Sequence, residues 1–324
     1  MDLQRLFRRF LGRNKEQHFE DDEQYQDLII GDEILTGVRE CSQRFEAMKP
    51  LLDRYQRTFT TLDIGANMGY FSFRIAKEYP AVAVMIESRS NDGLLARACD
   101  LNRANVVWLR CRITAEELEK LAKVEHFDVL LVMNFLHHLG DKWRLAWEAA
   151  LRMADHVLVE TPTDVGACGQ QYLSEINTEV ERNASHILGT FARHTGKGHS
   201  MLYHIVSESQ KKLIRPYWVL PKDKAFRDSR VMGQHDLRIN SNFSEKALIH
   251  GDRGQQPPWV PGINSMTYRA LGGAYPRAET IRTWASKLPS GPDMNLWNLI
   301  LSGDGLSVID QHGNHESLLW DYLP

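Results

Sequence analysis

The feature that most restricts the fold of this chain is a regular alternation of strand-like and helix-like segments that begins at Thr58. Short apolar, β-branched runs with strand character occupy residues 58–65, 81–87, 106–110, 127–134 and 156–160. Segments with helical periodicity lie between them, at residues 70–79, 90–105, 114–123 and 142–154. Strands separated by helices of about 10–15 residues form βαβ units, so the alternation predicts an α/β fold with a doubly wound parallel sheet.

The segments that follow extend this sheet. Residues 169–192 have helical periodicity, and two more strands are predicted at residues 200–207 and 213–220. The unbroken apolar character of Val82–Ile86 and Val129–Met133 is typical of strands that are buried on both faces. The pattern therefore predicts a seven-stranded, Rossmann-like sheet covered by helices on both sides.

Beyond Pro221 glycine and proline become frequent and the periodicity weakens. This change predicts a domain boundary near Arg215–Lys222. The expected organisation is an N-terminal helix, an α/β domain and a smaller α+β C-terminal module, at residues 1–19, 20–218 and 219–324 respectively.

The first residues predict a basic amphipathic helix. Its apolar face consists of Leu3, Leu6, Phe7, Phe10 and Leu11, and the remainder carries Arg5, Arg8, Arg9 and Arg13. Such a helix can dock on its own domain, which is the favoured interpretation, or lie on an anionic membrane surface. The second interpretation predicts a peripheral membrane contact through residues 1–15.

Charge and cysteine content narrow the classes of function. The 39 basic and 42 acidic side chains give a net charge of −3, which argues against nucleic-acid binding by broad electrostatic attraction. No apolar run reaches the roughly 18 residues of a membrane span, and no signal-peptide pattern is evident. The cysteines are scattered, as is typical of reduced thiols in a cytoplasmic protein, at Cys41, Cys99, Cys111 and Cys168.

A glycine-containing turn directly follows the first of these strands. It runs from Asp63 to Gly69 with the sequence Asp-Ile-Gly-Ala-Asn-Met-Gly, and a helix begins immediately after it. Glycine lets the backbone turn sharply and lets a ligand approach closely, and N–H groups at a helix start suit an anionic group. Glu87 ends the next strand, 24 positions after Asp63, where a carboxylate can accept both hydroxyl hydrogens of a ribose.

The spacing of the glycines separates two cofactor families. A dinucleotide site needs G-x-G-x-x-G, whereas Gly65 and Gly69 are four apart and an acidic residue stands two positions before Gly65. This pattern resembles motif I of class I S-adenosylmethionine (SAM)-dependent methyltransferases, over roughly residues 34–220, with Asn67 in place of the usual middle glycine. The resemblance implies a SAM site formed by Asp63, Gly65, Ala66, Asn67, Gly69, Phe71, Glu87, Arg112, Ile113, Asn134 and Phe135.

Within that site the resemblance assigns the methionine part of the cofactor to the turn. The ribose would lie at Glu87, and the adenine would lie near Arg112 and Ile113, after the third strand of the alternation.

Two adjacent histidines, His137 and His138, follow the fourth strand of the alternation. Side chains beyond the carboxyl ends of parallel strands face the reaction site in open α/β sheets. A neutral histidine can remove the proton from a hydroxyl acceptor, so either residue is a candidate general base. The alternative, in which one histidine caps the next helix or packs beneath the loop, stays open.

A second pattern lies near the end of the chain. Asp293 and Asn298 are followed by a strand, a Ser302–Gly305 turn, another strand and Asp310. This resembles the catalytic loop of aminoglycoside-phosphotransferase-like kinases, which implies Mg²⁺ and ATP at these three residues if the module is active. Gly291-Pro292 departs from the usual His-Gly, and the segment is too short for two kinase lobes. A degenerate module and a purely structural hairpin are therefore both alternatives.

Taken together, the patterns resemble bifunctional methyltransferase–kinase proteins that cap bacterial surface polysaccharides. The resemblance implies SAM-dependent O-methylation of a glycan or small hydroxyl acceptor, in the cytoplasm or at the inner face of a membrane. The alternatives are a Mg-ATP-dependent phosphotransferase, a bifunctional enzyme, or a non-catalytic scaffold with a cofactor fold. Binding to nucleic acid is disfavoured by the charge balance.

Overall fold

The computed structural model describes residues 25–39, 41–88, 92–123, 125–163, 172–193, 198–207, 261–288 and 299–308. Several predicted features lie outside these ranges: the N-terminal helix, the boundary near 215–222, the strand at 213–220, Cys168, and Asp293, Asn298 and Asp310. Among the residues described, no helix combines the length and apolar character needed to cross a membrane.

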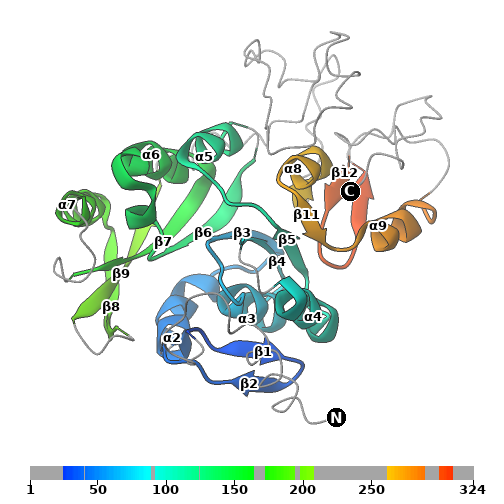
Figure 1. Ribbon diagram of the computed structural model, residues 1–324, viewed down its shortest axis with the longest axis horizontal. Helices are drawn as coiled ribbons and strands as arrows, with labels where there is room; N and C mark the ends of the chain where they lie inside the picture. The colour runs from blue at the N-terminus through cyan, green and yellow to red at the C-terminus, as the bar shows by residue number, and fades with distance from the viewer. Residues whose placement is uncertain are drawn as a thin grey trace, which may run out of the picture.

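The architecture is an eight-stranded mixed sheet between two layers of helices (Figure 1). The strand order is β11-β5-β4-β3-β6-β7-β9-β8. The strands are β3 (Phe59–Ile64), β4 (Ala81–Ile86), β5 (Val106–Leu109), β6 (Phe127–Met133), β7 (Ala154–Pro162), β8 (His186–Ala192), β9 (His199–Val206) and β11 (Gly273–Tyr275). The neighbours from β5 to β7 are parallel, whereas β9 is antiparallel to both β7 and β8. The predicted doubly wound, Rossmann-like α/β fold is confirmed.

The strand order reverses at β3. From there the chain first builds β4 and β5 on one side and then β6 and β7 on the other. In open α/β sheets this reversal leaves a crevice at the carboxyl ends of the strands, where ligands bind. The glycine turn follows β3 and therefore lies at this point.

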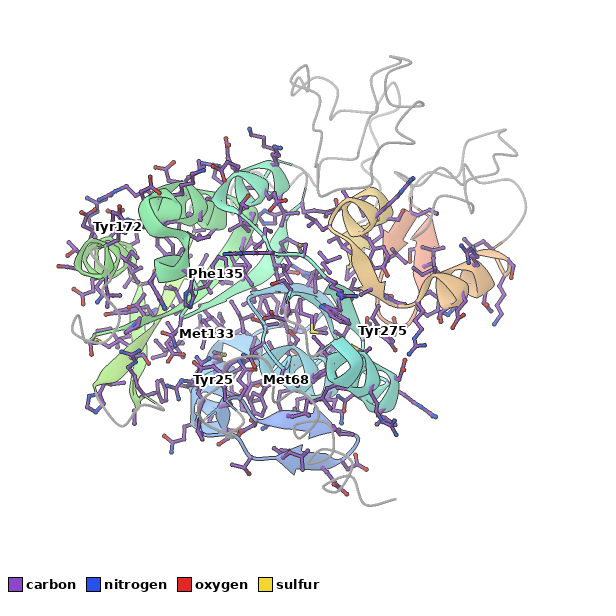
Figure 2. The ribbon with its side chains drawn as sticks, viewed as in Figure 1. Tyr25, Met68, Met133, Phe135, Tyr172 and Tyr275 are labelled. Carbon is purple, nitrogen blue, oxygen red and sulfur yellow. The ribbon has the colours of Figure 1, made fainter. Side chains whose placement is uncertain are left out.

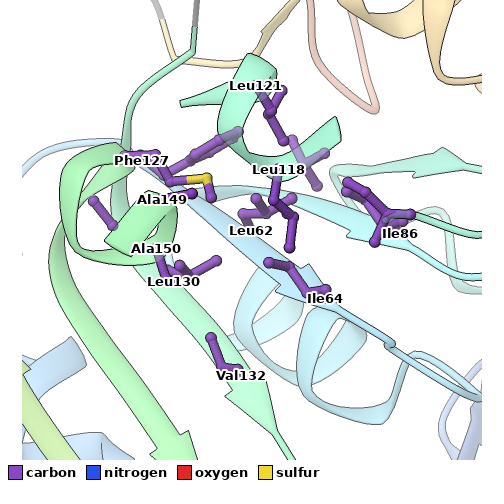
Figure 3. Packing of buried hydrophobic residues seen from close by; sticks show 14 of the residues in the cluster. Leu62, Ile64, Ile86, Leu118, Leu121, Phe127, Leu130, Val132, Ala149 and Ala150 are labelled. Atoms are coloured by element: carbon purple, nitrogen blue, oxygen red, sulfur yellow. The ribbon is translucent and has the colours of Figure 1, made fainter. Parts of the chain in front are cut away.

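Helices cover the apolar residues on both faces of the sheet. These helices are α2 (Cys41–Leu52), α3 (Tyr70–Glu78), α4 (Asp92–Asn102), α5 (Ala115–Leu121), α6 (Trp143–Met153) and α7 (Leu173–Asn183). One face packs against α5, α6 and α7, with Leu62 and Leu130 against Leu118 and Ala149 (Figure 3). The other face packs against α2, α3 and α4 through buried aromatic residues such as Phe45 and Phe73. Strands that are apolar on both faces are therefore required.

The prediction of one helical segment over residues 169–192 is wrong in its second half. Helix α7 ends at Asn183, and Ala184 already has an extended backbone with ψ 126°. The next residues form edge strand β8, because Ile187, Thr190 and Phe191 favour extended structure. The helix therefore joins β7 to β8, and β8 and β9 are the sixth and seventh strands of the sheet.

Residues 261–288 and 299–308 complete the described fold, with an eighth strand in the large sheet that the sequence did not predict. Strand β11 pairs antiparallel with β5 and adds an eighth strand at that edge. The remaining elements are β10 (Ile263–Asn264), α8 (Ser265–Ala270), α9 (Ala278–Ala285), β12 (Leu299–Leu301) and β13 (Leu306–Val308). The predicted hairpin turn is confirmed, since the Ser302 N–H donates to the Gly305 carbonyl at 3.0 Å between two antiparallel strands.

Polar contacts hold these residues on the rest of the fold. The buried Glu125 carboxylate accepts hydrogen bonds from the Asn264 N–H at 3.0 Å and the Thr267 hydroxyl at 2.6 Å. The Gly303 N–H donates to Asn105 Oδ1 at 2.7 Å. Ile263, Tyr268 and Leu301 belong to the same apolar cluster as β3 and β6. Residues 261–288 and 299–308 therefore share one core with the sheet.

The same docking predicts which turn glycine cannot be replaced. A Cβ on Gly303 would lie 2.1 Å from the Val106 nitrogen, whereas a Cβ on Gly305 would meet only Ser302 Oγ at 3.6 Å. We expect Gly303→Ala to lower the free energy of unfolding by about 1–3 kcal/mol because the turn must move away from β5. Gly305→Ala is the matched control and should change it little. Thermal unfolding of both variants is the measurement, and equal melting temperatures would contradict this packing.

Candidate cofactor and acceptor site

The turn between β3 and α3 has a backbone that requires glycine. Gly65, Asn67 and Gly69 have left-handed φ values of 70°, 57° and 72°. A Cβ on Gly65 would lie 3.1 Å from the Phe135 ring, and a Cβ on Gly69 would lie 3.0 Å from the Phe73 ring. Asparagine is among the few other residues that adopt this conformation readily. Asn67, which replaces the usual middle glycine, therefore still allows this turn.

Glu87 joins this turn to the end of β4. Its carboxylate accepts hydrogen bonds from the Asn67 N–H at 2.7 Å and from the Ser88 N–H at 2.8 Å, one on each oxygen. The residue is only 7% exposed. A carboxylate oxygen can accept more than one hydrogen bond, so both oxygens can still accept hydroxyl hydrogens from a ligand. The structure thus brings the two parts of the predicted cofactor site together.

Asp63 lies beneath the turn, near the end of β3. Its carboxyl group is buried and accepts a hydrogen bond from the Ser72 hydroxyl at 3.0 Å. Burial raises the pKa of Asp63 to about 7, and the hydrogen bond from Ser72 and the charge of Arg39 only partly oppose this. Asp63 therefore changes its charge near neutral pH.

The end of β6 faces the same turn. Asn134 has a left-handed φ of 58°, and its N–H donates to the Glu160 carbonyl at 2.9 Å. Its side-chain oxygen is buried and has no hydrogen-bond partner within the described ranges. Phe135, labelled at the centre of the molecule in Figure 2, lies over Gly65. An unpaired buried acceptor is costly, so Asn134 Oδ1 is a place for a ligand donor.

His137 and His138 lie in a 3-10 helix, η1 (Leu136–Lys142), beyond the carboxyl end of β6. Their ring centroids are 4.1 Å apart. His137 is half-buried and His138 is exposed. Burial lowers the pKa of His137 to about 4, and the neighbouring charges of His138 and Arg193 add to this effect. His137 is therefore neutral at physiological pH.

The N-cap positions next to these histidines are held by other residues. Phe135 is the N-cap residue of η1, and Lys142 is the N-cap residue of the following helix α6. Neither histidine is therefore the N-cap residue of these two helices.

The remaining predicted cofactor residues surround the turn and the end of β5. Ala66 and Phe71 are buried within the turn and the first part of α3. Ile113 is buried just before Thr114, which begins α5 with a reciprocal capping box, whereas Arg112 is exposed. Among the residues that the structure describes, no cluster of three or more His, Cys, Asp or Glu could hold a metal.

Sequence reasoning missed a buried ionic cluster that borders this site. Arg39 and the Nε of Arg44 both donate to the Glu160 carboxylate, the latter at 2.9 Å. Although burial raises the pKa of Glu160, the two guanidinium groups outweigh it and lower that pKa. Arg39 precedes Glu160 by 121 residues, so no local pattern could reveal the pair.

Comparisons with known proteins bear on overall shape only. No protein-family model and no curated protein matches the chain. Among solved structures, the N-terminal domain of EvdMO1 with S-adenosylhomocysteine (SAH) and D-fucose is 12% identical, with a TM-score of 0.44, covering 64% of this chain and 98% of that one. The bifunctional kinase-methyltransferase WbdD is 16% identical, with a TM-score of 0.46, covering 85% and 76%. An O-methyltransferase family protein from Burkholderia thailandensis is 12% identical, with a TM-score of 0.34, covering 50% and 57%.

The buried carboxyl group of Asp63 predicts a pH-dependent stability. Its pKa is about 7 in the folded protein against an ordinary value of 3.8, so the folded protein holds a proton that the unfolded chain releases between these pH values. Stability from this group is therefore lost as the pH rises from about 4 to 7. Asp63→Asn removes the buried charge while keeping an acceptor for Ser72. We expect its melting temperature to exceed that of the wild type by roughly 2–4 °C at pH 8.

The difference should shrink at pH 5, where Asp63 is protonated in the folded protein. Asp141→Asn, at an exposed position, is the control and should show no such pH dependence. Thermal unfolding at the two pH values is the measurement. A melting temperature of Asp63→Asn below that of the wild type at pH 8 would show that the charge is stabilising.

Proposed function

We propose that this protein is a SAM-dependent methyltransferase. The observation that carries the proposal is the hydrogen bond from the Asn67 N–H to the Glu87 carboxylate, at the point where the strand order reverses. This bond joins the turn, in which Gly65 and Gly69 are left-handed, to a carboxylate after β4 that can hold a ribose. This is the arrangement that an adenosine-containing cofactor requires.

The residues present fit SAM better than a dinucleotide. A pyrophosphate needs a second close glycine, and Asn67 with its side chain stands where that glycine would be. The amino-acid part of SAM carries an ammonium group, for which Asn134 Oδ1 is an unpaired buried acceptor. Glu87 would hold the ribose, and Ile113, which is buried four residues after the end of β5, would face the adenine.

Bound SAM would supply an electrophilic methyl group on sulfur. Because methyl transfer is an in-line displacement, the chain contributes chiefly by aligning the acceptor, which is worth several kcal/mol. A hydroxyl acceptor must also lose its proton. His137 is neutral at pH 7 and lies beyond the end of β6, so it can take that proton on a ring nitrogen.

The proposed acceptor is a glycan or another small hydroxyl compound. Two side-chain oxygens, Thr161 Oγ1 at the end of β7 and Asn177 Oδ1 on α7, are buried without a hydrogen-bond partner in the described residues. Asn177 is held there because its Nδ2 donates to the Pro162 carbonyl at 2.9 Å. Such atoms suit an acceptor that carries several hydroxyl groups. In the same proposal, residues 1–15 would bring the enzyme to a membrane that carries the acceptor.

A Mg-ATP-dependent phosphotransferase is the second candidate, supported by the β12–β13 hairpin that its pattern requires. The hairpin also has a purely structural role, because Gly303 in its turn packs against Val106 of β5. We therefore place methyl transfer first.

Calorimetry with SAH and with Mg-ATP tests the proposal. We expect the wild type to bind SAH and Glu87→Gln to bind it roughly 10–100-fold more weakly. The amide offers one acceptor oxygen instead of two, and its NH₂ group would face the N–H of Asn67 or Ser88. Glu148→Gln, at an exposed position on α6, is the matched control. Binding of Mg-ATP without SAH would favour the phosphotransferase, and binding of neither would favour a scaffold.

The general base can be identified from the pH dependence of kcat/KM together with substitutions of the two histidines. At saturating SAM, we expect kcat/KM for a hydroxyl acceptor to stay level from pH 8 to 6, because His137 gains a proton only near pH 4. His137→Ala should lower kcat by about 10²–10⁴-fold and leave SAH affinity unchanged. His199→Ala, an exposed histidine on β9, is the control. Loss of activity in His138→Ala alone would assign the base to His138 instead.

A further inference from the structure

The ionic cluster at the end of β7 carries an excess of positive charge. Arg39 and Arg44 are 3% and 1% exposed and share one carboxylate, that of Glu160, which is equally buried. Two guanidinium groups are always protonated, so this cluster has a net charge of +1. Burying an unbalanced charge is costly, and a bound anion would lower that cost.

The two arginines have different surroundings. Arg44 joins α2 to the sheet, because its NH2 also donates to the Ala192 carbonyl at 3.1 Å, at the end of β8. Arg39 has a buried Nε with no hydrogen-bond partner in the part of the chain that the structure describes. Arg44 and Glu160 alone would already form a balanced pair. Arg39 is therefore the source of the excess charge and of an unused donor.

Arg39 lies close to the start of α3, which directly follows the glycine turn. Its guanidinium carbon is 5.8 Å from the centroid of the Phe71 ring, two residues after Gly69, and 5.5 Å from that of Tyr25. The next residue, Gln26, accepts a hydrogen bond from the Met68 N–H of the turn at 3.3 Å. Arg39 is also close enough to Asp63 to act on its charge. The guanidinium group of Arg39 thus lies near Asp63 and the first residues of α3, beside the glycine turn.

An anion that enters this part of the site would balance the charge and use the free donor. Charge-assisted hydrogen bonds from arginine to a carboxylate are among the strongest in proteins. Resting on the proposed function, we infer that Arg39 binds the carboxylate of the amino-acid part of SAM. Glu160 then acts as a positioning residue, because its carboxylate accepts a hydrogen bond from the guanidinium group of Arg39 near the Phe71 and Tyr25 rings.

Calorimetry of the full chain with two ligands tests this role. SAH carries the carboxylate, and decarboxylated SAH (S-adenosyl-3-thiopropylamine) keeps the adenosine, sulfur and amine but lacks the carboxylate. We expect Arg39→Met to weaken SAH binding by roughly 10–100-fold and to change the affinity for the decarboxylated ligand by less than about twofold. Arg39→Lys keeps the charge without the planar geometry and should lose less affinity for SAH.

Each outcome has a separate meaning. If the wild type binds SAH and Arg39→Met binds it equally well, or if Arg39→Met loses both ligands to the same extent, the role of Arg39 is overturned while the proposed function stands. If the wild type binds neither ligand, the proposed function fails, and the assignment of Arg39 fails with it. Arg39→Met leaves the balanced Arg44–Glu160 pair in place, so we expect it to fold, and its melting temperature checks this. Arg144→Met, at an exposed site on α6, is the control.

Discussion

The end of β4 holds the turn between β3 and α3 through three backbone donors. The Gly65 and Ala66 N–H groups both donate to the Ile86 carbonyl, at 2.9 and 3.1 Å, and the Asn67 N–H donates to the Glu87 carboxylate. These bonds hold the turn, in which Gly65, Asn67 and Gly69 have left-handed backbone conformations. The start of α3 and the position of Phe135 over Gly65 both depend on this link.

Buried charge at the same edge of the sheet opposes stability. Asp63 is buried with one hydrogen bond from Ser72, and the Arg39, Arg44 and Glu160 cluster carries an excess positive charge. Burying such groups costs free energy that apolar residues of similar size would not cost. A fold does not need this arrangement for its core, which two large apolar clusters already provide. Under the proposed function, the carboxylate of SAM would balance the excess positive charge of this cluster.

Local signals were sufficient for most elements and insufficient for long-range ones. The Thr114 capping box, the glycine turn and the strand-sized apolar runs depend on a few neighbouring residues, so the sequence could reveal them. The helix at 169–192 was extended too far because no glycine or proline separates α7 from β8. Strand β11 has only three residues and forms because β5 offers a free edge. The Arg39–Glu160 pair depends entirely on tertiary structure, whereas the roles of the predicted site residues stay predictions.

The pairing of β11 with β5 also bears on the C-terminal residues. Without it, β5 would be an edge strand with unpaired backbone groups, a common site of aggregation. The Arg110 N–H donates to the Gly272 carbonyl at 3.0 Å, directly after β5 and two residues before Arg112. Residues 272–275 therefore support the strand end at which the adenine is proposed to lie. A structural reason for these residues exists whether or not the phosphotransferase pattern binds a nucleotide, and so their presence alone favours neither function.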